Sequence, residues 1–373
     1  MDSKIFNKYK TAADILNNAI KLAKNMIQPN TKIYDISSAC DEYIKLELGK
    51  TYKNLTKGLA LPTCISVNEI VCHYAPDSEN DYQLKKDDIL RIEMACYIEE
   101  YVVSTGETLQ VENNSITELD EMKAAKLALS TGLKMIEPFM VTKKFDNIIK
   151  EIAQLYGLEL LERPYVFNEA DATLAYDWVK RDDHKFLEQS WVVKCDQELD
   201  LEDLRTFEEE KYEKDTHFNI GDIYHLEVAF CKTNKSPVIS DTRGTLFQKT
   251  YIRHGLKSKY AREICTYVGK NIGNYFFKLS DLEMSPTQAR VGISEAKRHH
   301  VFRELGIIEK KDCPIIRLKC SIAIMENTIY LLTGKENIIT KDIDNKLTPE
   351  LLKIFQNNPK FSKRDAPVLT NGM

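Results

Sequence analysis

The chain has 373 residues, 43% of them hydrophobic, and a formal net charge of −5 at pH 7. This length is sufficient for one large or two medium domains with a buried core, and the acidity argues against general affinity for nucleic acid while allowing a local basic face. No apolar run is long enough to cross a bilayer, and the N-terminus MDSKIFNKYK has no secretory signal. We therefore expect a globular protein that stays inside the cell and makes no membrane contact.

Cysteine usage argues against two common ways of stabilising a fold. Nine cysteines are scattered along the chain and none forms a C-x-x-C pair, so neither a disulfide framework nor an ordinary structural zinc site is indicated. Cys313 and Cys320, with His299 and His300 nearby, are the one zinc alternative. We expect reduced thiols and no cofactor.

Two similar series of elements follow one another along the chain. Apolar residues with a period of 3.6 predict a helix over 11–27, a second helix follows over 35–48, and residues 58–76 have the pattern of strand and loop. The same order returns with helices over 118–136 and 145–156 and extended segments after them. The repetition predicts two halves with one plan.

Two strand sequences strengthen this repetition. DILRIE, which ends at Glu93, is echoed by DIYHLE, which ends at Glu227. The two glutamates would then be equivalent residues of the two halves. Because side chains alternate across a strand, Glu93 is expected to share a face with Arg91, and Glu227 with His225.

Charge is unevenly distributed in the second half. Residues 197–216 are dense in acids, which is typical of a solvated loop. Residues 242–262 contain no acid, and their cations are interleaved with aromatic side chains. These cations are Arg243, Lys249, Arg253, Lys257, Lys259 and Arg262. The stretch is either an ordinary strand and helix start, balanced by acids elsewhere, or a phosphate-binding face.

The last elements begin with helices predicted over 263–277 and 286–305. In 316–324, apolar residues alternate with polar ones, which predicts a strand. Lys319 therefore points with Arg317, away from the apolar row. TIYLLTG predicts another strand, and the final NNPKFSKRDAPVLTNGM has the composition of an extended tail.

Five stretches carry a resemblance to a known family. They are LPTCISVNEIVCHYAP, KKDDILRIEMACYIEEYVVSTGETL, FNIGDIYHLEVAF, HGLKSKYAREI and RVGISEAKRHHVFRELGII. Together they resemble type-II methionine aminopeptidases, and more closely their non-enzymatic relatives, the proliferation-associated or ErbB-3-binding protein family. The resemblance covers about Lys8 to Gly334.

The resemblance implies an α+β pita-bread fold, the creatinase/aminopeptidase-like architecture, in which helix pairs cover a pseudo-twofold antiparallel sheet. It implies one domain over 1–347 that carries a small inserted subdomain at about 242–308. The two halves would span about 8–111 and 112–335, and residues 348–373 would be a C-terminal extension.

Aminopeptidases of this family hold two divalent ions with two aspartates, a histidine and two glutamates. Carried onto this sequence, the resemblance places these positions at Glu93, Ser104, Tyr176, Glu227 and Lys319. Divalent ions require anionic oxygens, which only the two glutamates supply here. Lys319 would add a repulsion of roughly 4 kcal/mol per unit charge near 4 Å at an effective dielectric constant of 20. We therefore expect a degenerate site that binds no metal and catalyses no reaction, in which the Lys319 ammonium pairs with Glu227 or Glu93.

Other readings of these residues are simpler or less well supported. His73 matches the family histidine beside the bound peptide, and without metals it would make a structural hydrogen bond. Ser104 with a histidine is a candidate nucleophile, but no G-x-S-x-G elbow surrounds it. Cys72 and His73 would point to opposite faces of a strand.

The resemblance implies a non-catalytic factor that binds the large ribosomal subunit, through rRNA and exit-region proteins near the polypeptide exit, in ribosome maturation or translation. It also implies a monomer in the cytoplasm with a nuclear or nucleolar pool, and further RNA or protein partners. Because residues 348–373 carry few lysines, RNA contact is expected from the basic stretch 242–262. Two alternatives remain, a peptide- or protein-binding module that uses the old cleft and an active metallo-aminopeptidase.

Overall fold

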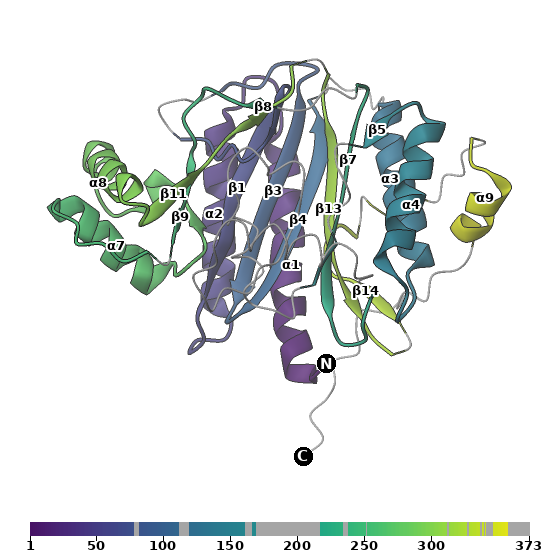
Figure 1. Ribbon diagram of the computed structural model, residues 1–373, viewed down its shortest axis with the longest axis horizontal. Helices are drawn as coiled ribbons and strands as arrows, with labels where there is room; N and C mark the ends of the chain where they lie inside the picture. Colours follow the sequence, from purple (N-terminus) through teal and green to yellow (C-terminus); the bar gives the residue numbers. More distant parts are fainter. Residues whose placement is uncertain are drawn as a thin grey trace, which may run out of the picture.

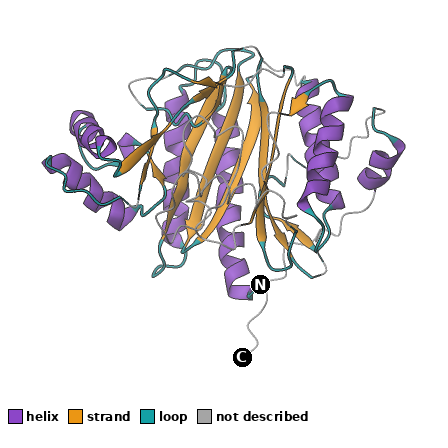
Figure 2. Ribbon diagram, in the orientation of Figure 1, coloured by secondary structure: helices purple, strands orange, loops and turns teal. Residues whose placement is uncertain are grey.

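An eight-stranded antiparallel sheet forms the centre of the computed structural model (Figures 1 and 2). The structure describes residues 1–77, 82–111, 119–160, 166–168, 217–233, 238–250, 252–311, 313–326, 328–335, 338, 340 and 346–356. The strand order is β1-β3-β4-β13-β7-β5, with β14 beside β13 and β6 beside β7. The strands are β1 (Lys57–Val67), β3 (Ile89–Ile98), β4 (Tyr101–Gln110), β5 (Glu159–Leu160), β6 (Val166–Asn168), β7 (Ile223–Cys231), β13 (Ile316–Ile324) and β14 (Ile329–Leu331).

Two helix pairs cover one face of this sheet. The pairs are α1 (Ser3–Met26) with α2 (Ile33–Lys50), and α3 (Asp120–Met135) with α4 (Thr142–Leu155). Each helix buries an apolar stripe. Alternate residues of the strands, such as Ile92 of β3 and Leu226 of β7, lie in the same apolar cores. The predicted α+β class is confirmed, and each half supplies a helix pair followed by strands on either side of the β4–β13 junction.

A smaller unit between β7 and β13 projects from one edge of the sheet (Figure 1). Its elements are β9 (Leu246–Lys249), α7 (Lys259–Asn271), β10 (Phe276–Phe277), the 3-10 turn η1 (Leu279–Asp281), α8 (Pro286–Arg298) and β11 (Phe302–Leu305). Strands β10-β9-β11 form a sheet, and the two helices pack with it around a separate apolar core that includes Phe247 and Phe277. Tyr275 stacks on Tyr97 of β3, with 4.0 Å between ring centroids. We call residues 246–305 the inserted unit.

The two helices predicted here were too long at their C-terminal ends. Helix α7 ends at Asn271, and Gly273 follows with a φ of 73°, which favours glycine and stops the helix. Helix α8 ends at Arg298, and His300 then has a φ of 55°. The apolar residues beyond these stops belong to β10 and β11.

A third small sheet joins β2 (Ile70–Cys72), β12 (Ile308–Glu309) and β8 (Val238–Ile239). Helix α9 (Pro349–Gln356) buries Leu351 and Phe355 in the core that α3 shares. The predicted tail at 357–373 and the acidic segment 197–216 lie outside the described residues. Within the described part of the chain, no helix combines the length and apolar character needed to cross a membrane.

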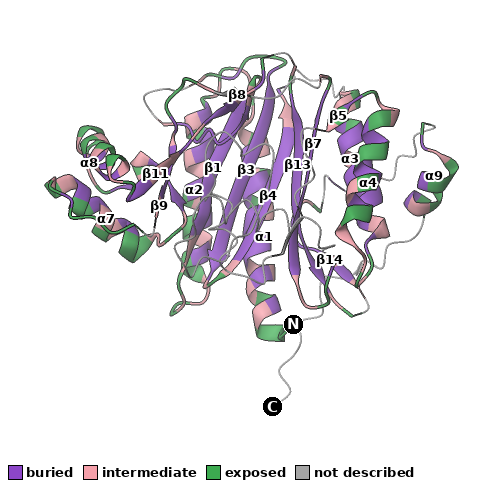
Figure 3. Ribbon diagram, in the orientation of Figure 1, coloured by how far each residue is buried: buried purple, intermediate pink, exposed green. Residues whose placement is uncertain are grey.

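Burial differs between the central sheet and the outer helices. The central strands are buried along most of their length, whereas the outer faces of α7, α8 and α4 are exposed (Figure 3). The face of the sheet that turns away from the helix pairs is also buried, yet it carries charged side chains, among them Arg91, Glu93, Glu227, Arg317 and Lys319. This polar buried face is where the predicted site residues meet.

Candidate functional site

The predicted site residues form a row across four strands. Glu93 of β3 pairs with Gly106 of β4, Gly106 with Lys319 of β13, and Lys319 with Glu227 of β7. The two glutamates therefore lie at the two ends of this row, on either side of the pseudo-twofold axis. Their strand neighbours point toward the helices, so both carboxylates face the opposite side of the sheet.

One guanidinium joins these two carboxylates. Arg317, two residues before Lys319 on β13, places Nη1 2.8 Å from Glu93 Oε2 and Nε 2.5 Å from Glu227 Oε1. The three side chains are 8%, 4% and 2% exposed. We expected Lys319 to pair with Glu227 or Glu93; Arg317, on the same face of β13, makes an ion pair with each of these glutamates. A planar guanidinium has several donors in a fixed fork and can bridge two carboxylates, which a single ammonium does less well.

The electrostatics of this cluster favour the ion-paired state. Burial opposes the charge of Arg317, but attraction to Glu227 and Glu93 raises its pKa well above the ordinary value. Arg91 is fully buried beside it and donates to the carbonyl oxygens of Ile315 and Asn68. Burial and repulsion from Arg317 lower the pKa of Arg91 to about 9. The two carboxylates are thus outnumbered by Arg91, Arg317 and Lys319.

Lys319 lies beside Gly106, which has no side chain. A Cβ on Gly106 would stand 3.0 Å from the Lys319 Cβ, so the glycine makes room for the lysine stem. Lys319 is 9% exposed, and its charge is one of the causes that lower the pKa values of His225 and His73, after burial.

Ser104 lies in the next row of the sheet, within a network of neutral groups. Its Oγ is 2.8 Å from Nδ1 of His225, and the same nitrogen is 2.6 Å from Oγ of Ser321. Ser321 also donates to the Ser104 carbonyl oxygen. Burial lowers the pKa of His225 well below its usual range. Ser104 is therefore buried and held by the histidine, an arrangement that suits a structural hydrogen bond better than a nucleophile open to substrate.

His73 is also buried, and it directly follows β2 of the small third sheet. Its Nδ1 lies 3.2 Å from the carbonyl oxygen of Gly306 and donates to it. Burial, with the charge of Arg317 second, lowers the pKa of His73 to about 3, so the ring is neutral. Tyr176, the remaining position carried over from the family, lies outside the described residues.

This donor set does not fit two divalent ions. Glu93 and Glu227 are bound to Arg317, Ser104 is a neutral hydroxyl that contacts His225, and Lys319 adds another charge. Divalent ions would need the negative charge of both carboxylates, which the guanidinium already balances through one oxygen of each. Across the described residues, no three His, Cys, Asp or Glu side chains are grouped to hold a metal ion. We derive no metal chemistry from this site.

The basic stretch lies on the inserted unit from residue 246 onward, and Arg243 comes just before the unit. Arg243, Arg253 and Lys257 are exposed, and among the described residues no ion pair joins them to an acid. Lys259 is exposed and lies 3.6 Å from Glu263. The Arg262 guanidinium donates to the carbonyl oxygens of Leu256 and Lys257. The Lys249 ammonium lies close to Gly269 of α7, where a Cβ would be 2.9 Å from it.

Known proteins resemble this chain in sequence and in fold. Residues 7–188 match Metallopeptidase family M24. ErbB-3 binding protein 1 of Solanum tuberosum is 25% identical over 365 residues, which cover 96% of this chain and 86% of that protein. This chain is related to the proliferation-associated and ErbB-3-binding proteins.

Solved structures support the pita-bread fold of this chain. A thermophilic Arx1 superposes with a TM-score of 0.74 at 20% identity, covering 97% of this chain and 100% of that one. A methionine aminopeptidase from Thermotoga maritima gives a TM-score of 0.52 at 14% identity, covering 89% and 98%. The predicted architecture is confirmed.

The sequence analysis did not predict the contacts of three residues of the site, Arg317, His225 and Ser321. Strand alternation already placed Arg317 on the face of Lys319 and His225 on the face of Glu227. What it lacked was the register of β13 against β4 and β7, which decides the side chains that meet.

Proposed function

We propose that this chain is a non-catalytic, ribosome-associated RNA-binding factor that acts at the large subunit near the polypeptide exit, in ribosome maturation or translation. The observation that carries the non-catalytic part is the Arg317 bridge between Glu93 and Glu227. A guanidinium that donates to one oxygen of each carboxylate supplies there the positive charge that cations would otherwise supply.

The RNA-binding part is supported by the inserted unit. Arg253 and Lys257 present charge to solvent on a unit that projects from the sheet edge (Figure 1), and Arg243 is exposed just before this unit. RNA is recognised largely through its phosphates and 2′-hydroxyls, to which Arg and Lys are suited. The kinship with ErbB-3-binding proteins favours ribosomal RNA and exit-region proteins as partners. We propose a monomer in the cytoplasm with a nuclear or nucleolar pool.

Co-sedimentation with purified large ribosomal subunits tests this proposal. Reversing Arg253, Lys257 and Lys259 to Glu should abolish co-sedimentation at moderate salt. We leave Arg262 unchanged because its guanidinium holds two carbonyl oxygens of the loop before α7, so that its loss would alter the unit itself.

A matched control comes from the other side of the molecule. Lys143, Lys144 and Lys150 are exposed on α4, and reversing them changes the net charge by the same amount. This variant should sediment with subunits as the unmodified chain does. Equal binding by both variants would contradict the assignment of RNA contact to the inserted unit.

A further inference from the structure

Three cysteines lie together in one small apolar cluster. Cys72 of β2, Cys231 of β7 and Cys313 of the loop before β13 share this cluster with residues that include Ala229 and Ile315. Every cysteine that the structure describes is a free thiol. The cluster is therefore a place where thiols from separate elements come close enough to ask whether two of them can react with each other.

Strand register brings Cys231 and Cys313 near each other. Phe230 of β7 pairs with Ile316 of β13, so Cys231, the last residue of β7, comes opposite Ile315. Phe230 lies in the core beneath the helices, whereas Cys231 and Ile315 lie in the small cluster on the other face of the sheet. Cys313 follows two residues beyond Ile315 and packs against the same cluster.

Both thiols contact Thr233, which follows the end of β7. Cys231 Sγ donates to the carbonyl oxygen of Thr233 at 3.1 Å, and Cys313 Sγ lies 3.8 Å from Thr233 Oγ1. Burial raises the pKa of Cys231 to about 11, and both the charge of Cys313 and a hydrogen bond with its side chain act in the same direction. The two thiols are thus in direct contact. To reach the S–S bond length of about 2.0 Å, the sulfur of the loop residue Cys313 has to approach that of Cys231.

The two thiols differ in exposure, and this difference sets the order of their chemistry. Cys231 is 2% exposed, and a thiol that burial keeps protonated reacts slowly with oxidants. Cys313 is half-buried, so a small oxidant can reach it. Because oxidation follows exposure and thiolate character, Cys313 is the residue to be oxidised first, and Cys231 is the one placed to react with the product.

We propose that Cys231 and Cys313 form a redox modification site, at which hydrogen peroxide converts the two thiols into a disulfide. The Cys313 thiolate attacks one peroxide oxygen and becomes a sulfenic acid, and the other oxygen leaves as water. The Cys231 sulfur then attacks the Cys313 sulfur and displaces the remaining oxygen as a second water. The two sulfurs lose two electrons and two protons in total, which reduce the peroxide to two waters. A dithiol reverses the reaction by thiol–disulfide exchange.

The disulfide would join the two connections of the inserted unit. Cys231 precedes the unit and Cys313 follows it, so the bond closes a loop that contains the whole of residues 246–305. Such a closure restricts the unfolded chain and stabilises the folded one. The inference goes beyond the proposed function, because neither cysteine belongs to the basic stretch 242–262 or to the Arg317 ion pairs.

Peptide mapping after peroxide treatment of the full chain tests the proposal. The chain is treated with a small excess of hydrogen peroxide at neutral pH, its remaining thiols are alkylated in denaturant, and it is digested with trypsin. The tryptic peptides 215–232 and 312–317 each contain one cysteine. We expect them as one disulfide-linked species that dithiothreitol separates. Oxidation should also raise the Tm of the chain by about 3 °C or more.

Two pairs of variants distinguish this site from other thiols. Cys313→Ser and Cys231→Ser should each abolish the linked species and the rise in Tm. Cys72→Ser, in the same apolar cluster, and Cys265→Ser, at a half-buried position of α7, should preserve both. Thermal unfolding of each reduced variant verifies that it is folded, and Cys313→Ser changes a half-buried loop residue, so the test does not depend on Cys231→Ser.

Three results would overturn the proposal. The first is recovery of Cys231 and Cys313 as alkylated thiols after peroxide treatment. The second is a disulfide in which either of them is linked mainly to Cys72 or to another cysteine. The third is conversion of Cys313 to sulfinic or sulfonic acid without the linked species, which would show that Cys231 does not reach it.

Discussion

The centre of the sheet and the inserted unit both carry cations, yet the two regions use them in opposite ways. Arg317 is buried and its guanidinium is committed to Glu93 and Glu227, whereas Arg253 and Lys257 are exposed on the inserted unit. A buried charge requires internal partners, because leaving it unpaired costs several kcal/mol. An exposed charge stays hydrated and can exchange water for phosphate. Arg317 thus has internal partners at the centre of the sheet, whereas Arg253 and Lys257 of the inserted unit are open to solvent.

The largest expected effect is the loss of the buried ion pair. Arg317→Ala leaves two buried carboxylates without their cation, and we expect the free energy of unfolding to fall by about 3–5 kcal/mol. Denaturant unfolding measures this loss of unfolding free energy. Lys50→Ala removes an exposed pair with Glu47 on α2 and should cost about 1 kcal/mol or less.

A rescue variant makes this test specific to charge. Arg317→Met combined with Glu93→Gln and Glu227→Gln removes the cation and both carboxylates together, and it should recover much of the lost stability. A cost for Arg317→Ala no greater than that for Lys50→Ala would show that the cluster does not stabilise the sheet.

A smaller effect is expected from the neutral histidines of the centre. The native pKa of His73 is about 3, because of burial first, whereas an unfolded histidine titrates near about 6.5. Below that pH the unfolded state binds the extra proton, so stability is lost as pH falls from about 6.5 toward 3. Each such histidine should lower the unfolding free energy by up to about 1.4 kcal/mol per pH unit.

Urea unfolding at pH 7, 6 and 5 measures this slope. His225, whose pKa is also lowered by burial, adds to it. His73→Asn should remove one histidine's share of the slope, while His300→Asn, at an exposed position of the inserted unit, should preserve it. A slope that His73→Asn leaves intact would mean that this ring is not held neutral by the fold.

The smallest effect concerns a single exposed cation of the inserted unit. Lys257→Ala should lower the slope of log K against log salt concentration by about 1 for binding to large subunits, because one phosphate contact is lost. Filter binding at several salt concentrations measures the slope. Lys143→Ala, on α4, should leave it unchanged, and an equal change in both variants would remove the distinction between the two surfaces.

Local patterns predicted much of this fold. The β13 strand was predicted at its observed bounds, 316–324, because alternation there is strict, and the echo of DILRIE in DIYHLE indicated that Glu93 and Glu227 are equivalent. The ends of α7 and α8 were missed because short apolar segments such as Phe276–Phe277 fit either a helix or a strand period.

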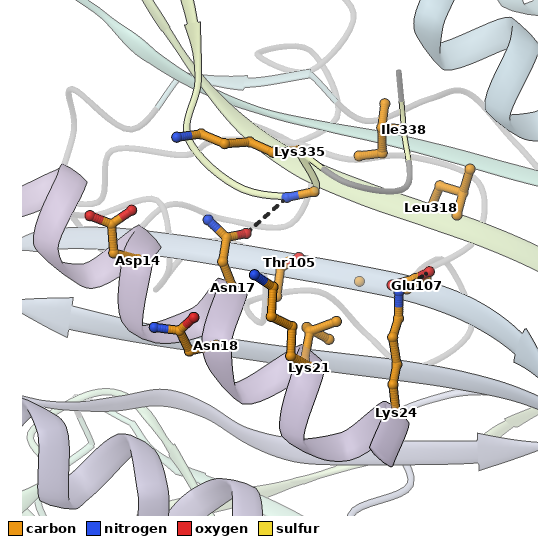
Figure 4. Close-up of a pocket in the computed structure, with 13 residues that line it drawn as sticks. Asp14, Asn17, Asn18, Lys21, Lys24, Thr105, Glu107, Leu318, Lys335 and Ile338 are labelled. Carbon is orange, nitrogen blue, oxygen red and sulfur yellow. Dashed lines mark hydrogen bonds and ion pairs between the residues drawn. The ribbon is translucent and has the colours of Figure 1, made fainter. Parts of the chain in front are cut away.

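Contacts across the sheet were harder to predict. Alternation gives the face of Arg317 but not the side chains it reaches, since these depend on the register of β13 against two other strands. The Ser104–His225 contact joins residues from different halves. The cavity that Asn17 of α1 helps to line depends on the hydrogen bond between Asn17 and Gly334, more than 300 residues away (Figure 4), which no local period reveals.

Titration calorimetry with Mn²⁺ or Co²⁺ tests the central claim most directly, namely that Arg317 has taken the place of metal ions between Glu93 and Glu227. We predict no saturable binding of two ions per chain near neutral pH, because the guanidinium holds both carboxylates. Binding of two ions per chain, lost in Glu93→Ala and Glu227→Ala, would contradict the claim and reopen the possibility of a metallo-aminopeptidase.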